Sequence, residues 1–359
     1  MRRNIRVKPR AVQAMIVGIS LFASTSVVGA QSAMYKQGMA AYKAHQYSQA
    51  ASLLARAPQE GSPGETDAML YRAMALIHLS RLPEAESALH AYLNQHPDSF
   101  EALVASGAVQ QREDKPRDSI QSFNQAARLR TLSPADLRVV ALDYVLLNDY
   151  TDAIHWLKKT LEFDRNNGQA WYDLGRCYYT QNLFKDAQNA LERANTLLPN
   201  NVKVLENLGL TLDAENLPSE AEAQYRKAVD LARQSADSVK PDRQTPIPRS
   251  DEWPYLNYGT FLISQDRAAD AVPQLKSAVA ANPKCAQCHL LLGRALAATG
   301  NLAAGVHELE QAVSLDPSDP KVHYQLARLY HQAGDRKRAR QEFALTAKLS
   351  HNTAAEHAP

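Results

Sequence analysis

Cys285, Cys288 and His289 are the residues of this sequence whose types and spacing most directly suggest chemistry. They form the pattern C-x-x-C-H, by which c-type haem is attached to a protein. The same two thiols suit a disulfide or a redox-active pair, whereas a zinc site would need two further ligands. The compartment of the chain and the element that carries the motif decide between these interpretations.

The first thirty residues show the three parts of a secretory leader. Five of the first ten residues are Arg or Lys, Ala11–Ala30 carries no charge, and Val28-Gly29-Ala30 supplies small residues before Gln31. We therefore predict a signal peptide over 1–30 and a periplasmic or secreted protein. The alternative is an inner-membrane anchor over residues 11–30, because twenty uncharged residues are just long enough to span a bilayer.

Loss of the leader changes the charge of the chain. It leaves 35 Lys and Arg against 38 Asp and Glu, a net charge of about −3. No basic excess remains for nucleic acid or anionic lipid, so neither is a predicted partner, and no stable membrane insertion is expected after cleavage. Export also places the cysteines where thiols oxidise, which favours a disulfide.

An internal repeat of 34 residues organises the chain after the leader. Its clearest copy has Trp171, Leu174, Gly175 and Tyr178 in the spacing W-x2-L-G-x2-Y. Nine repeats begin at Gln31, Thr66, Phe100, Pro134, Gly168, Val202, Glu252, Ala286 and Pro320. Positions are numbered below from 1 at these residues.

Three repeat positions predict close packing between two helices of each repeat. Position 8 is always glycine or alanine: Gly38, Ala73, Gly107, Ala141, Gly175, Gly209, Gly259, Gly293 and Ala327. Position 20 is always small: Ala50, Ala85, Ser119, Ala153, Ala187, Ala221, Ala271, Gly305 and Ala339. Position 24 is always bulky: Leu54, Leu89, Phe123, Leu157, Leu191, Tyr225, Leu275, Leu309 and Phe343. A glycine inside a helix costs up to about 1 kcal/mol, so close packing must offset that cost.

This pattern resembles the tetratricopeptide repeat family, and the resemblance covers nearly all of the chain after the leader. It implies an all-α fold, an α-solenoid that forms a right-handed superhelix of about nine helix–turn–helix repeats. Helix A of each repeat would line the concave side. The predicted organisation is repeats 1–6 over 31–235, a polar, proline-rich insert over 236–251, repeats 7–9 over 252–353, and a tail over 354–359.

The repeat frame also assigns a place to the cysteine motif. Cys285 ends repeat 7, Cys288 lies in the first turn of the next helix A, and His289 takes the position of Trp171, as His323 does one repeat later. His289 therefore has a structural role with or without iron. We predict a disulfide between Cys285 and Cys288, and neither cofactor nor metal. Covalent c-type haem with His289 and a redox-active pair stay open as alternatives. Cys177 is expected to be a buried, unpaired residue.

The nine repeats leave no room for a catalytic domain, and no catalytic motif is present, so we predict that the chain is not an enzyme. The main hypothesis is an exported scaffold or adaptor that binds an extended peptide or a helix of a partner protein through its concave groove. The predicted groove residues are Tyr172, Arg176, Tyr179, Asn207, Leu210, Asn257, Thr260, Arg294, Tyr324 and Arg328. An apolar surface for a helix or a dimer partner is expected from Val104, Ala105, Ala108, Leu142 and Val145. The alternatives are an electron-transfer protein that uses the cysteine motif and a structural protein that assembles envelope complexes by self-association.

Overall fold

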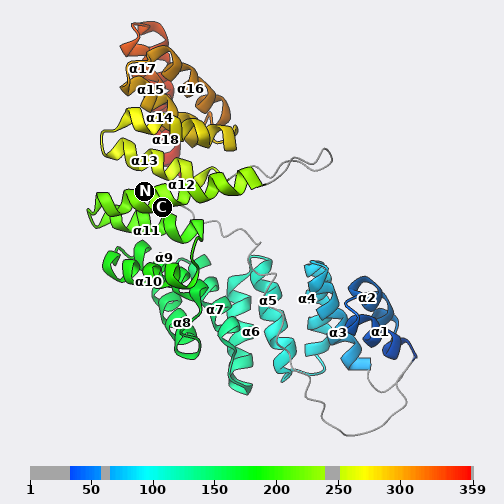
Figure 1. Ribbon diagram of the computed structural model, residues 1–359. Helices are drawn as coiled ribbons and strands as arrows, with labels where there is room; N and C mark the ends of the chain where they lie inside the picture. Colours follow the sequence, from blue (N-terminus) through cyan, green and yellow to red (C-terminus); the bar gives the residue numbers. More distant parts are fainter. Residues whose placement is uncertain (1–32, 58–64, 239–250, 357–359) are drawn as a thin grey trace. The chain divides into compact units, whose positions relative to one another are not determined.

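The computed structural model of the chain describes residues 33–57, 65–238 and 251–356. Within these residues it contains eighteen α-helices and no β-strand, which confirms the predicted all-α fold (Figure 1). The first nine helices are α1 (Ala33–Lys43), α2 (Tyr47–Arg56), α3 (Glu65–His78), α4 (Leu82–Leu93), α5 (Phe100–Arg112), α6 (Pro116–Leu129), α7 (Pro134–Leu146), α8 (Tyr150–Phe163) and α9 (Gly168–Thr180). The other nine are α10 (Phe184–Leu197), α11 (Val202–Ala214), α12 (Pro218–Ser238), α13 (Trp253–Ser264), α14 (Ala268–Ala281), α15 (Ala286–Ala298), α16 (Leu302–Leu315), α17 (Pro320–Gln332) and α18 (Arg336–Glu356). Odd-numbered helices are the helices A of the predicted repeats, and even-numbered helices are the helices B.

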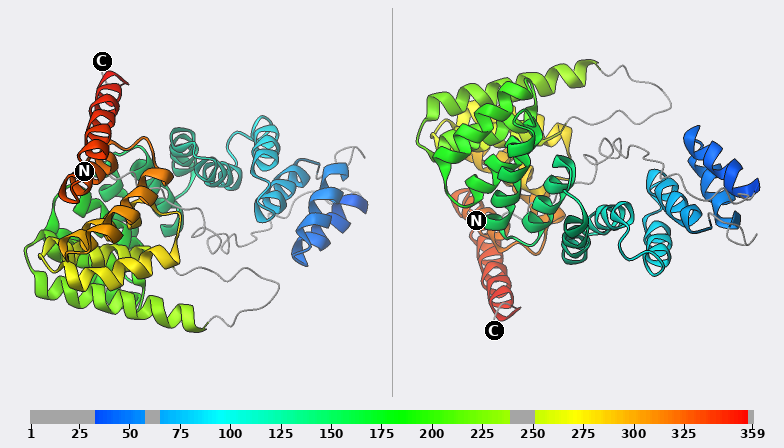
Figure 2. Two further views of the ribbon diagram at one scale, coloured as in Figure 1. Left: turned by 90° about the horizontal axis from the view of Figure 1, so that it is seen from above. Right: turned by 90° about the horizontal axis from the view of Figure 1, so that it is seen from below.

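The chain divides into two compact units, Met1–Gln181 and Asn182–Pro359. The boundary lies between helix A and helix B of repeat 5, so α1–α9 belong to the first unit and α10–α18 to the second. Within each unit, consecutive helices pack side by side (Figure 1, Figure 2). Each unit is therefore a stack of helical hairpins, as the repeat pattern predicts.

The turn between helix A and helix B has the same backbone conformation in every repeat. Position 15 has a positive φ angle in all nine turns: His45, Ser80, Asp114, Asn148, Asn182, Asn216, Asp266, Gly300 and Gly334. The next amide then bonds to the carbonyl five residues earlier, as Arg81 does to Leu76 at 3.0 Å and Asn301 to Leu296 at 2.9 Å. This is the Schellman ending of a helix, which satisfies carbonyls that the helix itself leaves without partners. It directs helix B back along helix A.

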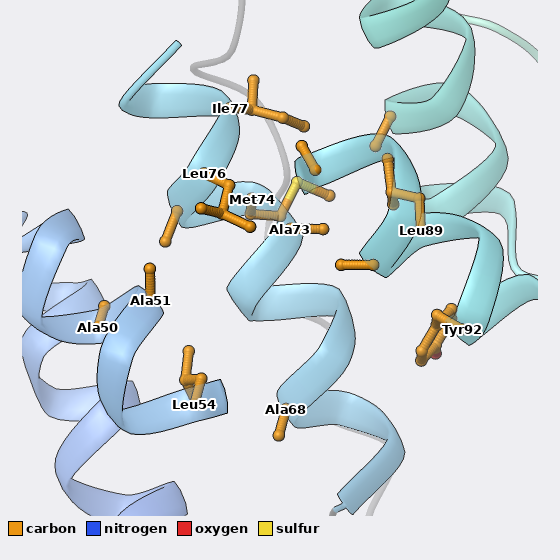
Figure 3. Packing of buried hydrophobic residues seen from close by; sticks show 14 of the residues in the cluster. Ala50, Ala51, Leu54, Ala68, Ala73, Met74, Leu76, Ile77, Leu89 and Tyr92 are labelled. Atoms are coloured by element: carbon orange, nitrogen blue, oxygen red, sulfur yellow. The ribbon is translucent and has the colours of Figure 1, made fainter. Parts of the chain in front are cut away.

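Positions 8 and 24 account for the close approach of the two helices, as predicted. A Cβ atom at Gly107 would lie 2.6 Å from the Phe123 ring, and one at Gly209 would lie 2.8 Å from the Tyr225 ring. Both glycines therefore make space for the bulky residue of their own repeat. Figure 3 shows the packing around α3, the helix A of repeat 2, which Leu54 of α2 in the preceding repeat and Leu89 of α4 in the same repeat approach from opposite sides.

Two helices extend beyond the predicted limits of their repeats. Helix α12 continues to Ser238, three residues into the predicted insert, and α18 continues to Glu356, three residues into the predicted tail. Residues 219–240 contain neither proline nor glycine, so no strong helix breaker stands at the predicted start of the insert. The predicted leader and residues 239–250 of the predicted insert lie outside the described residues.

Candidate functional site

The cysteine motif lies at the start of α15. Cys285 is the residue before the helix, and its Sγ accepts a hydrogen bond from the Cys288 amide at 3.0 Å. The Sγ atoms of Cys285 and Cys288 are within bonding distance, with their Cα atoms 5.2 Å apart. Cys288 is fully buried. The pair therefore closes the first turn of helix A in repeat 8.

His289 lies in the next position and is buried between two repeats. Its Nε2 lies 3.1 Å from the carbonyl oxygen of Pro283, and its Nδ1 lies 2.7 Å from Glu308 Oε2. A carbonyl oxygen only accepts hydrogen bonds, so Nε2 carries a proton and donates it. An iron ligand needs a nitrogen lone pair directed at the metal, which neither ring nitrogen offers in this arrangement. The residues present do not fit an axial haem ligand at His289.

The same bond recurs at position 4 of other repeats. His323 Nε2 lies 3.0 Å from the Pro317 carbonyl oxygen, and its Nδ1 lies 2.6 Å from Glu342. Trp171 Nε1 donates to the Arg165 carbonyl at 2.9 Å. In all three repeats a ring N–H at position 4 bonds to the carbonyl at position 32 of the preceding repeat. The structural role predicted for His289 is thus a link between consecutive repeats.

No group of three or more His, Cys, Asp or Glu side chains in the described ranges is placed to hold a metal ion. Among those same residues, no helix combines the length and the apolar character needed to cross a bilayer. Cys177 is buried and unpaired as predicted, and burial raises the pKa of its thiol to about 12.

The predicted groove residues of the first unit lie on α9. Tyr172 is only 8% exposed, while Arg176 and Tyr179 are half-buried. The Arg176 guanidinium lies 5.5 Å from the centre of the Tyr172 ring, within the range of a cation–π contact. The structure therefore brings Arg176 and Tyr172 together and turns most of the tyrosine inward.

In the second unit, Asn257 serves the stack and is not presented to a ligand. It is 8% exposed, and its Nδ2 donates to Glu206 Oε1 of the preceding helix A at 2.7 Å. Burial raises the pKa of the Glu206 carboxyl to about 7. Arg138 and Asp173 form the same kind of link in the first unit, at 2.7 Å. Positions 5 and 6 of successive helices A therefore face each other across the repeat boundary.

Other predicted groove residues of the second unit bond within their own helix. The Asn207 side chain donates to the Lys203 carbonyl at 2.8 Å, and the Thr260 hydroxyl donates to the Leu256 carbonyl at 2.7 Å. Leu210 is half-buried. These three side chains stay partly accessible along α11 and α13, and the polar groups of Asn207 and Thr260 bond to their own helix.

Three predicted groove residues are exposed. Arg294 and Arg328 occupy position 9 of the neighbouring helices α15 and α17, and Tyr324 lies one turn before Arg328. Neither guanidinium has an ion-pair partner among the described residues. Tyr324 is 45% exposed. These residues form the most accessible part of the predicted groove.

The apolar surface predicted from the first four repeats is mostly inside the stack. Ala105, Leu142 and Val145 are buried, and Val104 and Ala108 are half-buried. The prediction of an exposed apolar patch was wrong for the three buried residues, because neighbouring helices A cover them. The sequence had shown which helix carries them, but not how closely the next repeat approaches.

Sequence reasoning also missed the buried polar pair of Ser119 and Asp143. Ser119 Oγ lies 2.5 Å from Asp143 Oδ2 and 2.9 Å from the Gly107 carbonyl oxygen. A signal was present, because Ser119 is the only hydroxyl at position 20 and Asp143 is a charged residue at position 10 of the following repeat. Burial raises the pKa of the Asp143 carboxyl to about 8.

Two family profiles of the tetratricopeptide repeat match the chain. One covers residues 41–106, 144–205 and 303–358, and the other covers residues 178–236 and 262–320. The chain belongs to the tetratricopeptide repeat family, whose fold is typical of protein–protein interaction.

The chain is also similar to curated proteins and to solved structures. Protein FlbA of Caulobacter vibrioides is 28% identical over 190 residues, which are 53% of this chain and 29% of FlbA, so the chain spans less than a third of that relative. A tetratricopeptide repeat protein from Parabacteroides merdae superposes with a TM-score of 0.57 at 15% identity, covering 74% of this chain and 98% of that one. PilW, a widely conserved type IV pilus biogenesis factor, superposes with a TM-score of 0.50 at 21% identity, covering 59% of this chain and 90% of PilW. At these identities the two structures show the fold alone.

Proposed function

We propose that this protein is a non-catalytic scaffold that binds an extended, acidic segment of a partner protein along its helix A surface. The observation that carries the proposal is the pair of exposed arginines at position 9 of α15 and α17. Other polar groups of the predicted groove, those of Asn207, Asn257 and Thr260, bond to a neighbouring repeat or to their own helix. The two arginines are left to act on something outside the stack.

The chemistry of arginine gives the partner its character. A guanidinium presents several N–H groups in one plane and pairs with carboxylates, and arginine and tyrosine are enriched among residues that dominate binding energy. Arg294 and Arg328 recur one repeat apart on neighbouring helices, with Tyr324 beside them. An extended segment with two spaced acidic side chains matches this arrangement.

The proposal includes export and a structural disulfide. The uncharged run Ala11–Ala30 after a basic start supports a cleaved leader. The sulfur atoms of Cys285 and Cys288 are within bonding distance, which supports a disulfide in an oxidising compartment. No covalent cofactor is proposed, because His289 uses both ring nitrogens inside the stack.

A display library of random peptides tests the proposal directly. Selection on the full chain should enrich acidic sequences, and the double variant Arg294→Glu/Arg328→Glu should bind them at least about tenfold more weakly. The matched control is Lys227→Glu/Lys276→Glu, which makes the same charge change on exposed helix B positions of the same unit. Equal binding by both double variants would refute the helix A site, and enrichment of basic peptides would refute the proposed chemistry.

A further inference from the structure

The last repeat leaves uncovered a position that the other repeats bury. At position 24, the described residues Leu54, Leu89, Phe123, Leu157, Leu191, Tyr225, Leu275 and Leu309 are 0–1% exposed. Phe343 holds the same position in α18 and is 39% exposed. A phenylalanine there buries large apolar area when a helix covers it, so its exposure marks an incomplete packing surface.

A second stacking position on the same end is also uncovered. Position 5 meets the following helix A in earlier repeats, as Arg138 meets Asp173 and Glu206 meets Asn257. Tyr324 is the position 5 residue of repeat 9 and is 45% exposed. Its ring packs edge-on against Phe343 at 5.9 Å between centroids. The two aromatic side chains form one surface, which we call the end face of α17 and α18.

The repeat geometry indicates what shape fits the end face. In earlier repeats of each unit, the residues at these positions are covered by helix A of the following repeat, which lies alongside the preceding hairpin. The end face therefore exposes to solvent the kind of surface on which a following helix A packs in the earlier repeats. An α-helix is the element that completes it, because a single hairpin cannot bury its own apolar side.

The charge of α18 indicates which charge a helix bound to the end face should carry. Residues 336–350 contain five basic side chains and one acidic side chain, and the acidic one, Glu342, is engaged by His323. Position 21 carries an acidic residue in repeats 2 and 6. Glu86 and Glu222 hold it in earlier repeats and pair with Lys115 and Arg267 of the following repeat, each at 2.7 Å. Repeat 9 has Arg340 at position 21, so a helix that packs there would pair with this residue through an acidic side chain.

A second copy of the chain is a poor match for this surface. The first helix A that the structure describes is α1, which carries Lys36 and Lys43, and residues 33–57 contain no Asp or Glu. Pairing α18 with α18 of another copy would oppose basic helices. We propose that the end face of α17 and α18 binds an acidic amphipathic α-helix of another protein. This site adjoins the helix A surface of Arg294 and Arg328, because Tyr324 borders both, and Phe343 and Arg340 of α18 belong to the end face alone.

A pair of synthetic helices tests the proposal on the full chain. Each has about eighteen residues, or five turns, and an apolar stripe copied from Val322, Leu326 and Leu329 of α17. All other positions are Glu in one peptide and Lys in its twin. Fluorescence anisotropy should show the Glu peptide binding at least about tenfold more tightly than the Lys peptide, and Arg340→Glu should reduce that difference several-fold.

Substitutions at two exposed phenylalanines distinguish binding at the end face from non-specific hydrophobic binding. Phe343→Ser should weaken binding of the Glu peptide at least about tenfold. Phe163→Ser is the matched control, because Phe163 is 57% exposed on α8 in the other unit, and it should leave binding unchanged. Equal effects of the two substitutions, or failure of the Glu peptide to bind, would overturn the proposal. Light scattering checks for a second copy. If the wild-type chain were a dimer and Phe343→Ser made it a monomer, the proposal would also be overturned, because a second copy would then be the occupant. Melting curves of each variant confirm that the repeats remain folded.

Discussion

The Ser119 hydroxyl lies between two acceptors, with Asp143 Oδ2 at 2.5 Å and the Gly107 carbonyl oxygen at 2.9 Å. A hydroxyl has one proton, so it cannot donate to both. The arrangement is satisfied when Asp143 is protonated and donates to Ser119, which then donates to Gly107. Asp143 is fully buried, and burial raises the pKa of its carboxyl to about 8.

Stability of the first unit should therefore fall as pH rises. Asp143 has a higher pKa in the folded chain than in the unfolded chain, where the usual value is about 3.9. Its contribution is complete below the unfolded pKa and is lost as pH rises through about 8. Urea denaturation should show a loss of about 1–3 kcal/mol between pH 6 and pH 8. Asp143→Asn should reduce that dependence to the part that Glu206 of the second unit contributes, whereas the exposed control Asp230→Asn should keep it in full. An unchanged slope in Asp143→Asn would show that the pair is not the source.

Gly300, in the turn after helix A of repeat 8, allows a test of the positive φ angle that position 15 adopts in every repeat. Gly300 has φ of 87°, and a Cβ atom there would touch nothing within 4 Å. Gly300→Ala should therefore cost about 1 kcal/mol or more from backbone strain alone. Asp266→Gly, at the same position of repeat 7 with φ of 56°, should raise stability by about a few tenths of a kcal/mol. Urea denaturation followed by circular dichroism measures both, and equal effects of the two changes would contradict the shared conformation.

Periodicity within a repeat could be predicted from the sequence, whereas contacts across repeats could not. Gly107 and Phe123 were correctly paired because both lie at fixed positions of one hairpin. Asn257 was assigned to the groove, yet it bonds to Glu206, because the approach of two helices A depends on how hairpins stack. The angle at which hairpins stack does not change the 34-residue periodicity, so the sequence pattern does not reveal it. The exposure of Phe343 could not be predicted either, since its position is buried in the other repeats.

Helix packing in repeat 6 depends on a glycine matched to a tyrosine. The Cβ of Gly209→Ala would lie 2.8 Å from the Tyr225 ring, which is fully buried, so the substitution should cost about 1–3 kcal/mol. Repeats 2 and 4 pair an alanine at position 8 with a leucine at position 24. Gly209→Ala/Tyr225→Leu should therefore recover part of the loss, and a double-mutant cycle on urea denaturation measures the coupling. Strict additivity of the two changes would contradict direct contact.

Export predicts a defined start of the mature chain. Cleavage after Ala30 would leave Gln31 as the first residue, because small residues precede that bond. Mass analysis of the protein from a bacterial periplasmic fraction should find this shortened chain. Ala30→Pro blocks the cleavage site and should leave the full chain attached to membranes. An intact Met1 in the wild-type protein would instead support the anchor over residues 11–30.

The state of Cys285 and Cys288 is the remaining prediction, and it separates the scaffold from an electron-transfer protein. In a host that attaches haem, the exported chain should have the bare mass less two hydrogens and should show no Soret absorption. A disulfide that closes so short a loop stabilises by up to about 2 kcal/mol in the chain-entropy model, so a reductant should lower the stability of the second unit by no more than that. Cys285→Ser/Cys288→Ser should remove the response to reductant. It should nevertheless keep the start of α15, because a serine hydroxyl can accept the bond that the Cys288 amide now gives to Cys285. Haem mass on the chain, or a Soret band that survives denaturation, would contradict the disulfide and would require His289 to leave the Pro283 carbonyl.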